Sequence, residues 1–435
     1  MNRRDFLQTA AAVSAASSVN LVSASENAPV PTPSGAGPAD GALATPENAG
    51  SMSPSGTSPD APPQVFRNPF KGGLSLPSLG FGVFRMPMDT NISQKLVDTA
   101  MASGINYFDT AYTYLGGKAE DLCARLLAKY PRESYFFATK MPPMNPGSTP
   151  ADLTRIFDDQ LKKSRVEYFD FYLCHNLQVN SWAHAKRVGM VEFLQKKKEE
   201  GKIRNLGFSF HDTPELLAEI ADFHPWDFAL IQLNYFDWIP YRSGEQYEVL
   251  RKRNIPICVM EPLRGGLLAN LGEKGNAVFK NANPHATIAS WAFRYVASLP
   301  GVFTVLSGMD CMEHLVENIQ TFSNFKPITD AEKKIITAAL EAFGSTGSIP
   351  CTDCKYCLPC PLEIDIPSVF TIYNQFKRTI DIRPRFPGIR QMELKMLEQA
   401  KTCVSCKQCL NRCPQKINIP EAHRQVVKDE MKRNV

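Results

Sequence analysis

Short apolar runs alternate with longer amphipathic segments through the middle of the chain, from residue 64 to about residue 343. The short runs have the length of buried strands, and the longer segments repeat apolar residues with helical period, as in 153–161 and 217–220. The predicted strands are 79–82, 105–108, 135–139, 169–174, 203–208, 228–232, 257–260 and 302–306. Each is followed by a helical segment, which predicts an α/β fold with a closed (β/α)8 TIM barrel rather than an open doubly wound sheet.

The C-terminal part, residues 344–435, is organised by cysteines. The first run is Cys351-Thr-Asp-Cys354-Lys-Tyr-Cys357-Leu-Pro-Cys360, and the second is Cys403-Val-Ser-Cys406-Lys-Gln-Cys409-Leu-Asn-Arg-Cys413. The second run matches the C-x2-C-x2-C-x3-C-P pattern of bacterial ferredoxins, and the first has a shorter last gap. Both continue as C-P-x-x-I-x-I-P, so the same unit is used twice.

This pattern predicts two [4Fe–4S] clusters with crossed ligation, because in two-cluster ferredoxins the fourth Cys of a run binds the other cluster. The expected ligands are Cys351, Cys354, Cys357 and Cys413 for one cluster, and Cys403, Cys406, Cys409 and Cys360 for the other. Predicted helices over 368–378 and 391–401 make this a small α-helical dicluster domain. Residues 344–349 are expected to form a short hinge before it.

Two other uses of these cysteines fit the spacing less well. A zinc site takes four ligands, usually as two separated pairs, and the two runs exceed that need. Tightly spaced triplets also make poor disulfide cross-links between distant elements. The remaining cysteines, Cys123, Cys174, Cys258 and Cys311, are expected to be small buried hydrophobic residues.

The N-terminus has the composition of an export signal. A twin arginine at 3–4 precedes Phe-Leu and an Ala/Ser-rich run to residue 24, and residues 25–63 are rich in Pro, Ala, Ser and Gly. We expect a twin-arginine signal over 1–24, a flexible linker over 25–63 and a periplasmic protein that is exported folded. The alternative for 1–24 is an ordinary amphipathic helix.

The composition bears on which classes of partner the protein binds. The formal net charge of +4 is spread along the chain, which does not indicate nucleic acid or an anionic membrane as a partner. No apolar run approaches the roughly 20 residues that span a bilayer. A hydrophobic share of 43% is sufficient for a large core.

Polar residues of catalytic type follow successive predicted strands. Asp109 and Tyr114 follow the second, Lys140 the third and His175 the fourth. Each alone has an ordinary explanation: a helix cap, a packed aromatic ring or a core histidine. Together they indicate an active site, because barrel chemistry is found at the carboxyl ends of the strands.

Several stretches resemble the aldo/keto reductase family. They are Asn106-Tyr-Phe-Asp109-Thr-Ala-Tyr-Thr-Tyr114, Ala138-Thr-Lys140, Tyr172-Leu-Cys-His175, Gly207-Phe-Ser209, Ile231-Gln232-Leu-Asn234 and Glu317-Asn318. The likeness covers roughly residues 66–343. With the cysteine runs, the chain is similar to the branch of the family that carries a C-terminal dicluster ferredoxin module.

The resemblance implies a mechanism. A nicotinamide delivers hydride to a carbonyl carbon while Tyr114 gives its proton to the oxygen. Lys140 favours the phenolate, because a phenol has a pKa near 10 and needs a nearby cation. Asp109 holds Lys140, and His175 orients the carbonyl with Asn176 beside it. The implied cofactor contacts are Ser209 and Gln232 at the carboxamide, and Ser307, Gly308, Glu317 and Asn318 around the phosphate and the last helix.

Two features differ from the family. Met260-Glu261-Pro262-Leu263 stands where the family usually has a tyrosine beneath the nicotinamide ring, and methionine stacks less strongly. Gly308 and His314 stand where NADPH-selective members have Lys and Arg, so the choice of NADP or NAD stays open. Arg264 is a further candidate contact for pyrophosphate or substrate.

We therefore expect an oxidoreductase that acts on a small carbonyl or alcohol substrate with a nicotinamide cofactor and exchanges electrons through the clusters. Nicotinamide moves two electrons as hydride, whereas clusters move single electrons, and no flavin motif is visible to convert between them. A redox partner protein is possible. The alternatives are an electron-transfer protein whose barrel is a docking or ligand-binding scaffold, and clusters that are only structural.

Overall fold

The computed structural model describes residues 62–239, 241–343, 349–378 and 389–431. The predicted signal at 1–24, nearly all of the linker at 25–63 and most of the hinge at 344–349 lie outside these residues. From Pro63 onward, the described residues belong to one compact unit.

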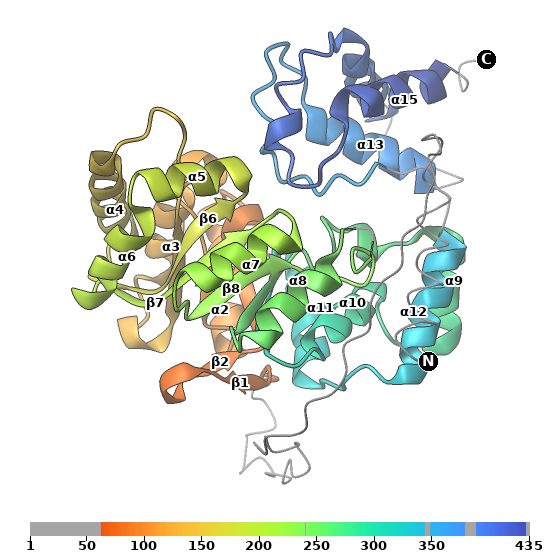
Figure 1. The fold of residues 1–435 in the computed structure, drawn as a ribbon. Helices are drawn as coiled ribbons and strands as arrows, with labels where there is room; N and C mark the ends of the chain where they lie inside the picture. Colours follow the sequence, from red (N-terminus) through yellow and green to blue (C-terminus); the bar gives the residue numbers. More distant parts are fainter. Residues whose placement is uncertain (1–61, 240, 344–348, 379–388, 432–435) are drawn as a thin grey trace, which may run out of the picture. The chain divides into compact units, whose positions relative to one another are not determined.

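Eight parallel strands close into a barrel in the order β10-β3-β4-β5-β6-β7-β8-β9 (Figure 1). They are β3 (Leu79–Gly82), β4 (Tyr107–Asp109), β5 (Phe136–Met141), β6 (Phe169–Leu177), β7 (Ile203–Phe210), β8 (Phe228–Gln232), β9 (Ile257–Met260) and β10 (Val302–Ser307). The predicted (β/α)8 barrel is confirmed.

Several strands extend further than predicted. The expected strands ended at residues 108, 139, 174 and 208, whereas β4 includes Asp109, β5 includes Lys140, β6 includes His175 and β7 includes Ser209. The hydrophobic pattern stops early because these polar side chains belong to strands whose backbones still pair with their neighbours. Asp109, Lys140 and His175 therefore lie within strands, whereas Tyr114 follows β4.

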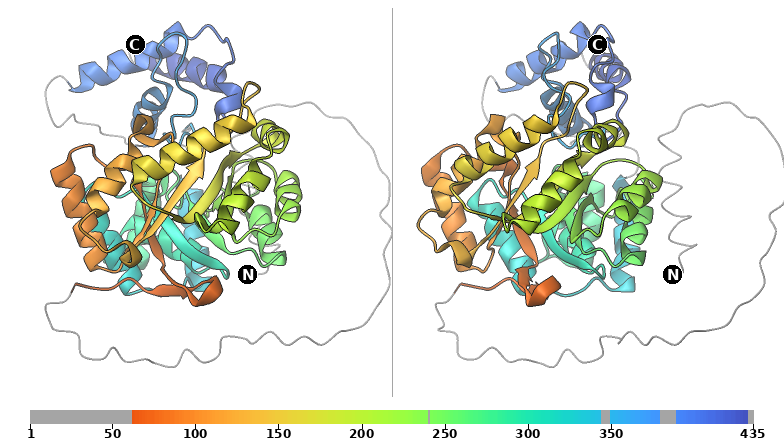
Figure 2. Two further views of the ribbon diagram at one scale, coloured as in Figure 1. Left: turned by 90° about the vertical axis from the view of Figure 1, so that its left-hand side faces the viewer. Right: turned by 60° about the vertical axis from the view of Figure 1, so that its left-hand side comes forward.

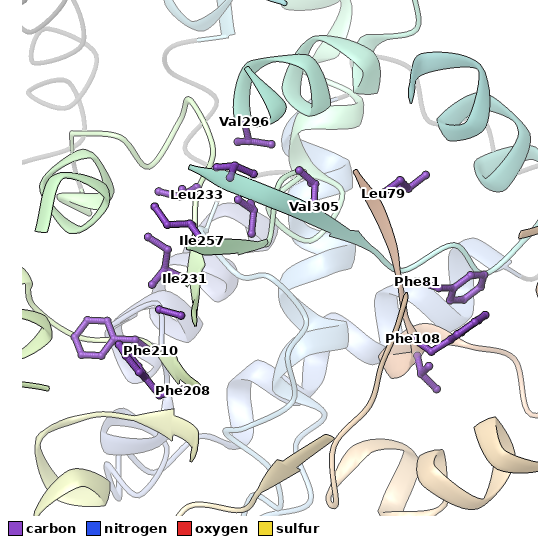
Figure 3. Packing of buried hydrophobic residues seen from close by; sticks show 14 of the residues in the cluster. Leu79, Phe81, Phe108, Phe208, Phe210, Ile231, Leu233, Ile257, Val296 and Val305 are labelled. Carbon is purple, nitrogen blue, oxygen red and sulfur yellow. The ribbon is translucent and has the colours of Figure 1, made fainter. Parts of the chain in front are cut away.

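Strand alternation separates two sets of buried side chains. Tyr107, Phe171, Leu173 and Phe228 belong to one cluster inside the barrel. Residues next to these in the strands, such as Phe108 and Tyr172, belong instead to a larger buried cluster, part of which Figure 3 shows. This period of two follows from the pleat of a strand.

A short antiparallel hairpin of β1 (Arg67–Pro69) and β2 (Ser75–Pro77) precedes the barrel and was not predicted. Its Phe70 ring lies 4.8 Å from the ring of Phe303 and 5.5 Å from that of Phe171. The hairpin therefore closes the end of the barrel where the strands begin, and the opposite end stays open to the site.

Eleven helices follow or flank the strands (Figures 1 and 2). They are α2 (Thr90–Ala102), α3 (Ala119–Leu127), α4 (Pro150–Ser164), α5 (Val179–Arg187), α6 (Met190–Glu199), α7 (Pro214–Phe223), α8 (Ser243–Lys252), α9 (Gly272–Ala282), α10 (Ile288–Ala297), α11 (Met312–Ser323) and α12 (Asp330–Phe343). Capping residues in the local sequence define where several of these helices begin. At α4, for example, Thr149 and Asp152 form a capping box and Pro150 takes the first helical position.

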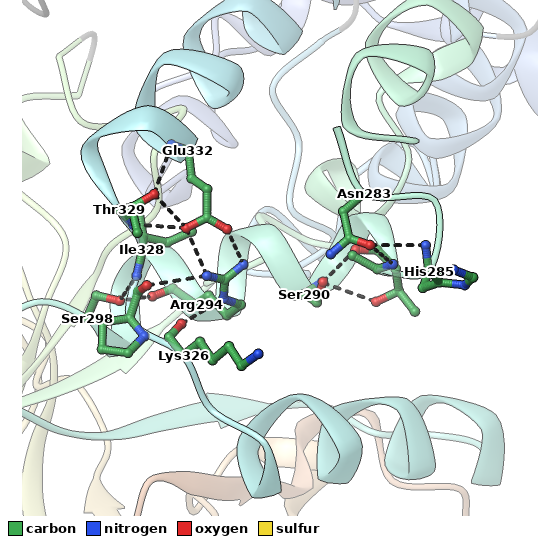
Figure 4. A network of polar contacts seen from close by, with 12 residues as sticks. Asn283, His285, Ser290, Arg294, Ser298, Lys326, Ile328, Thr329 and Glu332 are labelled. Carbon is green, nitrogen blue, oxygen red and sulfur yellow. Dashed lines mark hydrogen bonds and ion pairs between the residues drawn. The ribbon is translucent and has the colours of Figure 1, made fainter. Parts of the chain in front are cut away.

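A network of polar contacts holds the last helix of the barrel domain in place (Figure 4). The guanidinium of Arg294 in α10 binds both carboxylate oxygens of Glu332 in α12, at 2.7 and 2.9 Å. Glu332 also accepts from the backbone of Thr329, so it caps the helix that it anchors. A bidentate pair of this kind fixes orientation as well as distance.

The C-terminal module has its own core. Its helices are α13 (Ile366–Arg378), α14 (Ile389–Glu398) and α15 (Ile419–Met431), with short 3-10 turns at η6 (Gln399–Thr402) and η7 (Leu410–Arg412). Ile364, Phe370, Ile417 and Val426 are buried together with Cys357 and Cys413. The predicted helices at 368–378 and 391–401 are present, although each begins two residues earlier than expected.

Among the four remaining cysteines, Cys123, Cys174 and Cys258 are buried as expected, while Cys311 is only half-buried because it immediately precedes α11. Within the described part of the chain, no helix combines the length and apolar character needed to cross a bilayer.

Candidate functional site

The polar residues at the open end of the barrel follow from strand alternation. Asp109 lies two positions after the interior residue Tyr107, and His175 lies two positions after the interior residue Leu173. Because side chains two apart share a face, both point into the mouth of the barrel. Lys140, Ser209, Gln232 and Met260 are each the last or next-to-last residue of their strands. The sequence therefore builds a polar layer on top of an apolar interior.

Lys140 and Asp109 form a buried ion pair. Lys140 Nζ lies 2.6 Å from Asp109 Oδ1 and also donates to the carbonyl oxygen of Thr110 at 2.5 Å. The lysine side chain is 0% exposed and the aspartate side chain 6% exposed. Burial raises the pKa of Asp109, and the ammonium of Lys140 opposes that rise. The pair therefore supplies fixed charges that solvent does not screen.

Tyr114 begins the 3-10 turn η3 (Tyr114–Gly117), directly after β4. Lys140 Nζ lies 4.8 Å from the centre of its ring. Burial raises the pKa of Tyr114 well above its ordinary value, the carboxylates of Asp109 and Glu261 add to the rise, and a hydrogen bond with Tyr356 opposes it. Lys140 faces the ring of the phenol, and the expected lowering of its pKa is not found. Tyr114 is therefore a protonated donor at neutral pH.

His175 joins the tyrosine to the C-terminal module. Its ring centre lies 5.7 Å from that of Tyr114, and its Nε2 lies 3.0 Å from the hydroxyl of Tyr356. Burial lowers the pKa of His175 well below its ordinary value, and Lys140 adds to this, so the imidazole is neutral. Next to it, the pairing of β6 with β7 is irregular and Asn176 has a φ of 52°. Irregularities of this kind re-aim side chains near sites.

A cavity of about 1240 Å³ opens onto these residues. Tyr114, His175 and Asn176 line it from the barrel, and Cys354 and Tyr356 line it from the module. Its wider rim also includes Asn145, Gln178, Asn180, Ser181, Asn411, Lys355, Arg412 and Lys416. The cavity is therefore large, and polar and apolar side chains from both parts of the chain line it.

The residues expected to bind a dinucleotide are largely engaged with other protein groups. Ser209 Oγ accepts from the backbone N–H of Asn176 at 2.7 Å, and Ser307 Oγ accepts from Asn318 at 3.1 Å. Gln232 and Gln415 exchange two amide hydrogen bonds, at 3.1 and 2.8 Å.

The remaining expected contacts also lie outside the cavity. Gly308 packs against the side chain of Arg85, whereas Glu317 is exposed. Arg264 differs from its expected role, because it is fully buried and pairs with Asp237 at 2.7 Å. Met260 is half-buried against the interior cluster of the barrel. Among these residues, Nη1 and Nη2 of Arg264 are buried and have no hydrogen-bond partner in the described part of the chain.

The cysteines fall into two groups that combine the runs. Cys351, Cys354, Cys357 and Cys413 line one small cavity in the module. Burial raises the pKa of Cys409, and the neighbouring thiols of Cys403, Cys406 and Cys360 add to the rise. The fourth cysteine of each run therefore lies with the first three of the other run. Buried thiols of this kind ionise when a cation lies among them.

The spacing of these thiols is wider than a single metal ion requires. Thiolates around one zinc ion lie about 4 Å apart, given a Zn–S bond of about 2.3 Å. Among the described residues, the only three potential ligand atoms within 4.8 Å of one another belong to Asp310, Cys311 and His314. The cysteine groups therefore fit the larger cage of an iron–sulfur cluster better than zinc.

Sequence reasoning missed Tyr356, Gln415, Arg85 and Thr352. Tyr356 and Gln415 had a usable signal, because a large aromatic residue between two ligands and a glutamine after Cys-Pro are available to contact a neighbouring domain. Arg85 and Thr352 had none. Arg85 binds the carbonyl oxygen of Thr352 at 2.9 Å across 267 positions of sequence.

Comparison with known proteins supports the two-part organisation. A model of the aldo/keto reductase family matches residues 78–341, and a model of the 4Fe-4S dicluster domain matches residues 350–418. A probable aldo-keto reductase of Glycine max is 27% identical over 213 residues, which cover 46% of this chain and 60% of that protein. An uncharacterized oxidoreductase of Bacillus subtilis, YqkF, is 24% identical over 289 residues, covering 60% of this chain and 92% of its own.

Solved structures share the barrel. The holo form of aldo-keto reductase AKR11C1 from Bacillus halodurans has a TM-score of 0.55 at 21% identity, covering 63% of this chain and 96% of its own. Glycerol dehydrogenase AKR11B4 from Gluconobacter oxydans has a TM-score of 0.54 at 20% identity, covering 66% and 97%. At these identities the likeness shows the fold. In each case the matched share of the chain is close to the share that the barrel makes up.

The buried ion pair leads to a stability prediction. Asp109→Asn leaves the ammonium of Lys140 buried without its counter-charge, so we expect the free energy of unfolding to fall by about 3–5 kcal/mol. Urea unfolding of the anaerobically purified protein measures this loss. The matched control is Asp330→Asn, which breaks a solvent-exposed pair with Lys333 and is expected to leave the free energy of unfolding nearly unchanged. Equal losses in the two variants would contradict the prediction.

Proposed function

The chain belongs to the aldo/keto reductase family, and on that premise we propose that it interconverts a carbonyl and an alcohol at Tyr114, with electrons exchanged through two [4Fe–4S] clusters. One observation carries the proposal. The cavity that reaches Tyr114 and His175 from the barrel is lined on its other side by the cluster-type cysteine Cys354. A small organic substrate in this cavity would meet acid–base groups and a thiol of the first cysteine group together.

The tetrad supplies the proton chemistry. Tyr114 donates its proton to the carbonyl oxygen during reduction and takes it back during oxidation. Burial keeps the phenol protonated, while Lys140 over its ring stabilises the negative charge that develops as the proton leaves. Asp109 holds the ammonium in place at 2.6 Å.

His175 acts as a neutral hydrogen-bonding group. Its Nε2 bonds the hydroxyl of Tyr356 at 3.0 Å, beside the ring of Tyr114. A carbonyl oxygen that approaches Tyr114 would meet this pair of residues as well. His175 therefore orients the substrate, and Asn176, which also lines the cavity, can share in polar contacts.

The two cysteine groups are the proposed cluster ligands. The first cluster takes Cys351, Cys354, Cys357 and Cys413, and the second takes Cys403, Cys406, Cys409 and Cys360. When bound, the clusters supply transfer of single electrons. The second group is closer to solvent: Cys406 is exposed and the adjacent Val404 is 69% exposed. This supports a redox partner protein that docks on the second group.

Hydride transfer from NADPH or NADH is the form of this reaction expected from the family. Its proposed contacts are those given by the sequence: Ser209, Gln232, Ser307, Gly308, Glu317 and Asn318. These residues do not fit a dinucleotide while Gln415 is hydrogen-bonded to the amide of Gln232. The roles of Tyr114, Lys140 and His175 given above do not depend on a bound dinucleotide.

A second candidate function is electron transfer alone, with the barrel as a scaffold. The observation that favours it is the packing of the module over the cofactor side of the barrel mouth. The two functions differ in whether Tyr114 matters for turnover.

We also propose export to the periplasm by the twin-arginine route, because clusters are inserted before export and this route carries folded proteins. The arginines at positions 3 and 4 support it. Fractionation of expressing cells tests this. Arg3→Lys combined with Arg4→Lys should retain the protein in the cytoplasm, and unchanged export of the double variant would contradict the proposal.

Tyr114→Phe tests the chemistry, because it keeps the ring and removes the proton. With 4-nitrobenzaldehyde as probe and reduced methyl viologen as electron donor, we expect the rate to fall about 10²–10⁴-fold. Tyr112→Phe is the matched control, since its ring lies over Lys163 instead of the cavity, and its rate should stay within about twofold. Wild-type turnover in Tyr114→Phe would contradict the proposed role of Tyr114, and absence of turnover in the wild-type protein would favour the electron-transfer function.

Cys413→Ser tests the crossed ligation. We expect it to lose roughly half of the bound iron and to abolish the paramagnetic signal of the cluster held by the first run, not that of the second. Iron analysis and electron paramagnetic resonance measure the two effects. Cys311→Ser, which lies in neither group, should keep full iron content. Loss of the second run's signal instead would show that ligation does not cross.

A further inference from the structure

The mouth of the barrel has two sides, and only one of them is open. The shared cavity approaches Tyr114 and His175 from the side of β4 to β7. On the other side, around the ends of β8, β9 and β10, lie Gln232, Ser307 and Gly308, three of the residues expected to hold a dinucleotide. The C-terminal module contacts this second side at three separate places.

In the first contact, the side-chain amide of Gln415 binds Gln232, the residue that is expected to bind the carboxamide of a nicotinamide. Gln232 Nε2 donates to Gln415 Oε1 at 3.1 Å, and Gln415 Nε2 donates to Gln232 Oε1 at 2.8 Å. Gln232 Nε2 also donates to Asp237 at 2.6 Å, so both its donors and its acceptor are used. Gln415 is 4% exposed. Its amide presents the same donor and acceptor as the carboxamide of a nicotinamide.

The second contact is a close approach of two backbones. A Cβ atom built on Gly265, in the loop after β9, would lie 2.6 Å from the Cα of Thr352 and 2.7 Å from its carbonyl oxygen. The cysteine loop therefore rests directly on this turn, and no space for a phosphate group remains between them. Gly265 also has a φ of +63°, so two conditions require glycine here.

The third contact pairs the module with Arg85, a cation that lies beside the predicted phosphate turn. Arg85, from the 3-10 turn η2 (Val83–Arg85), packs its aliphatic part on Gly308. Its guanidinium donates to the carbonyl oxygen of Thr352 at 2.9 Å and to the carboxylate of Asp353 at 3.1 Å. An anionic phosphate near Gly308 would compete with that carboxylate for Arg85.

We propose that the C-terminal module takes the place of a nicotinamide dinucleotide at the barrel mouth, so that the seated protein binds neither NADPH nor NADH. Gln415 covers the carboxamide position, Thr352 the turn after β9, and Asp353 the cation beside the phosphate turn. The substrate cavity stays open on the opposite side, where Tyr356 faces the tetrad.

The consequence for the reaction rests on the proposed function. Reduction of a carbonyl to an alcohol takes up two electrons and two protons. Without a hydride donor, the electrons come singly from two molecules of a reduced one-electron carrier protein, which are oxidised in turn. One proton comes from Tyr114, which is reprotonated afterwards, and the other comes from solvent.

Isothermal titration of the full chain with both clusters loaded, under anaerobic conditions, tests the exclusion. We expect no saturable binding of NADPH or NADH up to about 1 mM, a limit that corresponds to about −4.1 kcal/mol. Saturable binding of either nucleotide within that range overturns the proposal. The measurement needs neither turnover nor a variant, so its result is independent of whether Tyr114 is catalytic.

A pair of glycine variants tests whether the module packs against the turn after β9. Gly265→Ala places a methyl group against Thr352, whereas Gly266→Ala has a similarly positive φ of +90° and meets no atom within 4 Å. We expect hydrogen exchange across residues 351–357 to rise at least tenfold in Gly265→Ala and to stay at the wild-type rate in Gly266→Ala. Equal rates of hydrogen exchange in the two variants would overturn the proposed packing of the module against this turn. If Gly265→Ala does not fold, the nucleotide titration of the wild-type protein still decides the proposal.

Discussion

The hydrogen bond between Tyr356 and His175 is the interaction on which the rest of the site depends. It joins the loop that carries the first cysteines to the polar layer of the barrel. Tyr356 stands between Cys354 and Cys357, so a group held by these thiols lies beside the tetrad. The barrel alone would present Tyr114 to an open mouth. With the loop in place, Tyr114 is partly buried, its pKa rises, and the cavity acquires a second wall.

Much of the barrel site could be predicted because alternate residues of a strand lie on the same face, and this alternation can be followed in the sequence. Apolar residues such as Tyr107 and Leu173 fix which face is interior, and Asp109 and His175 follow two positions later on the same face. The predicted strands ended too early, since a polar residue at a strand end resembles a loop. The repeated cysteine unit likewise indicated a crossed pairing of the runs.

The relation between the two parts could not be predicted in this way. Gln232 and Gln415 are separated by 183 positions, and no periodic pattern reports a pairing between surfaces that fold around different cores. The pKa of Tyr114 was misjudged for the same reason. The sequence indicated a lysine nearby, whereas burial by the C-terminal module, which dominates, depends on that unpredicted contact. The two cysteine groups also differ in exposure, which gives the molecule an inner group beside the cavity and an outer group beside solvent.

The central claim is that electrons reach this site without a nicotinamide, and one anaerobic titration tests it directly. The visible absorbance of the loaded clusters is followed while NADPH, NADH and then dithionite are added to the full chain. The account predicts that neither nucleotide bleaches the cluster band and that dithionite does. Bleaching by either nucleotide would show that the barrel accepts hydride from a dinucleotide, and it would contradict the account.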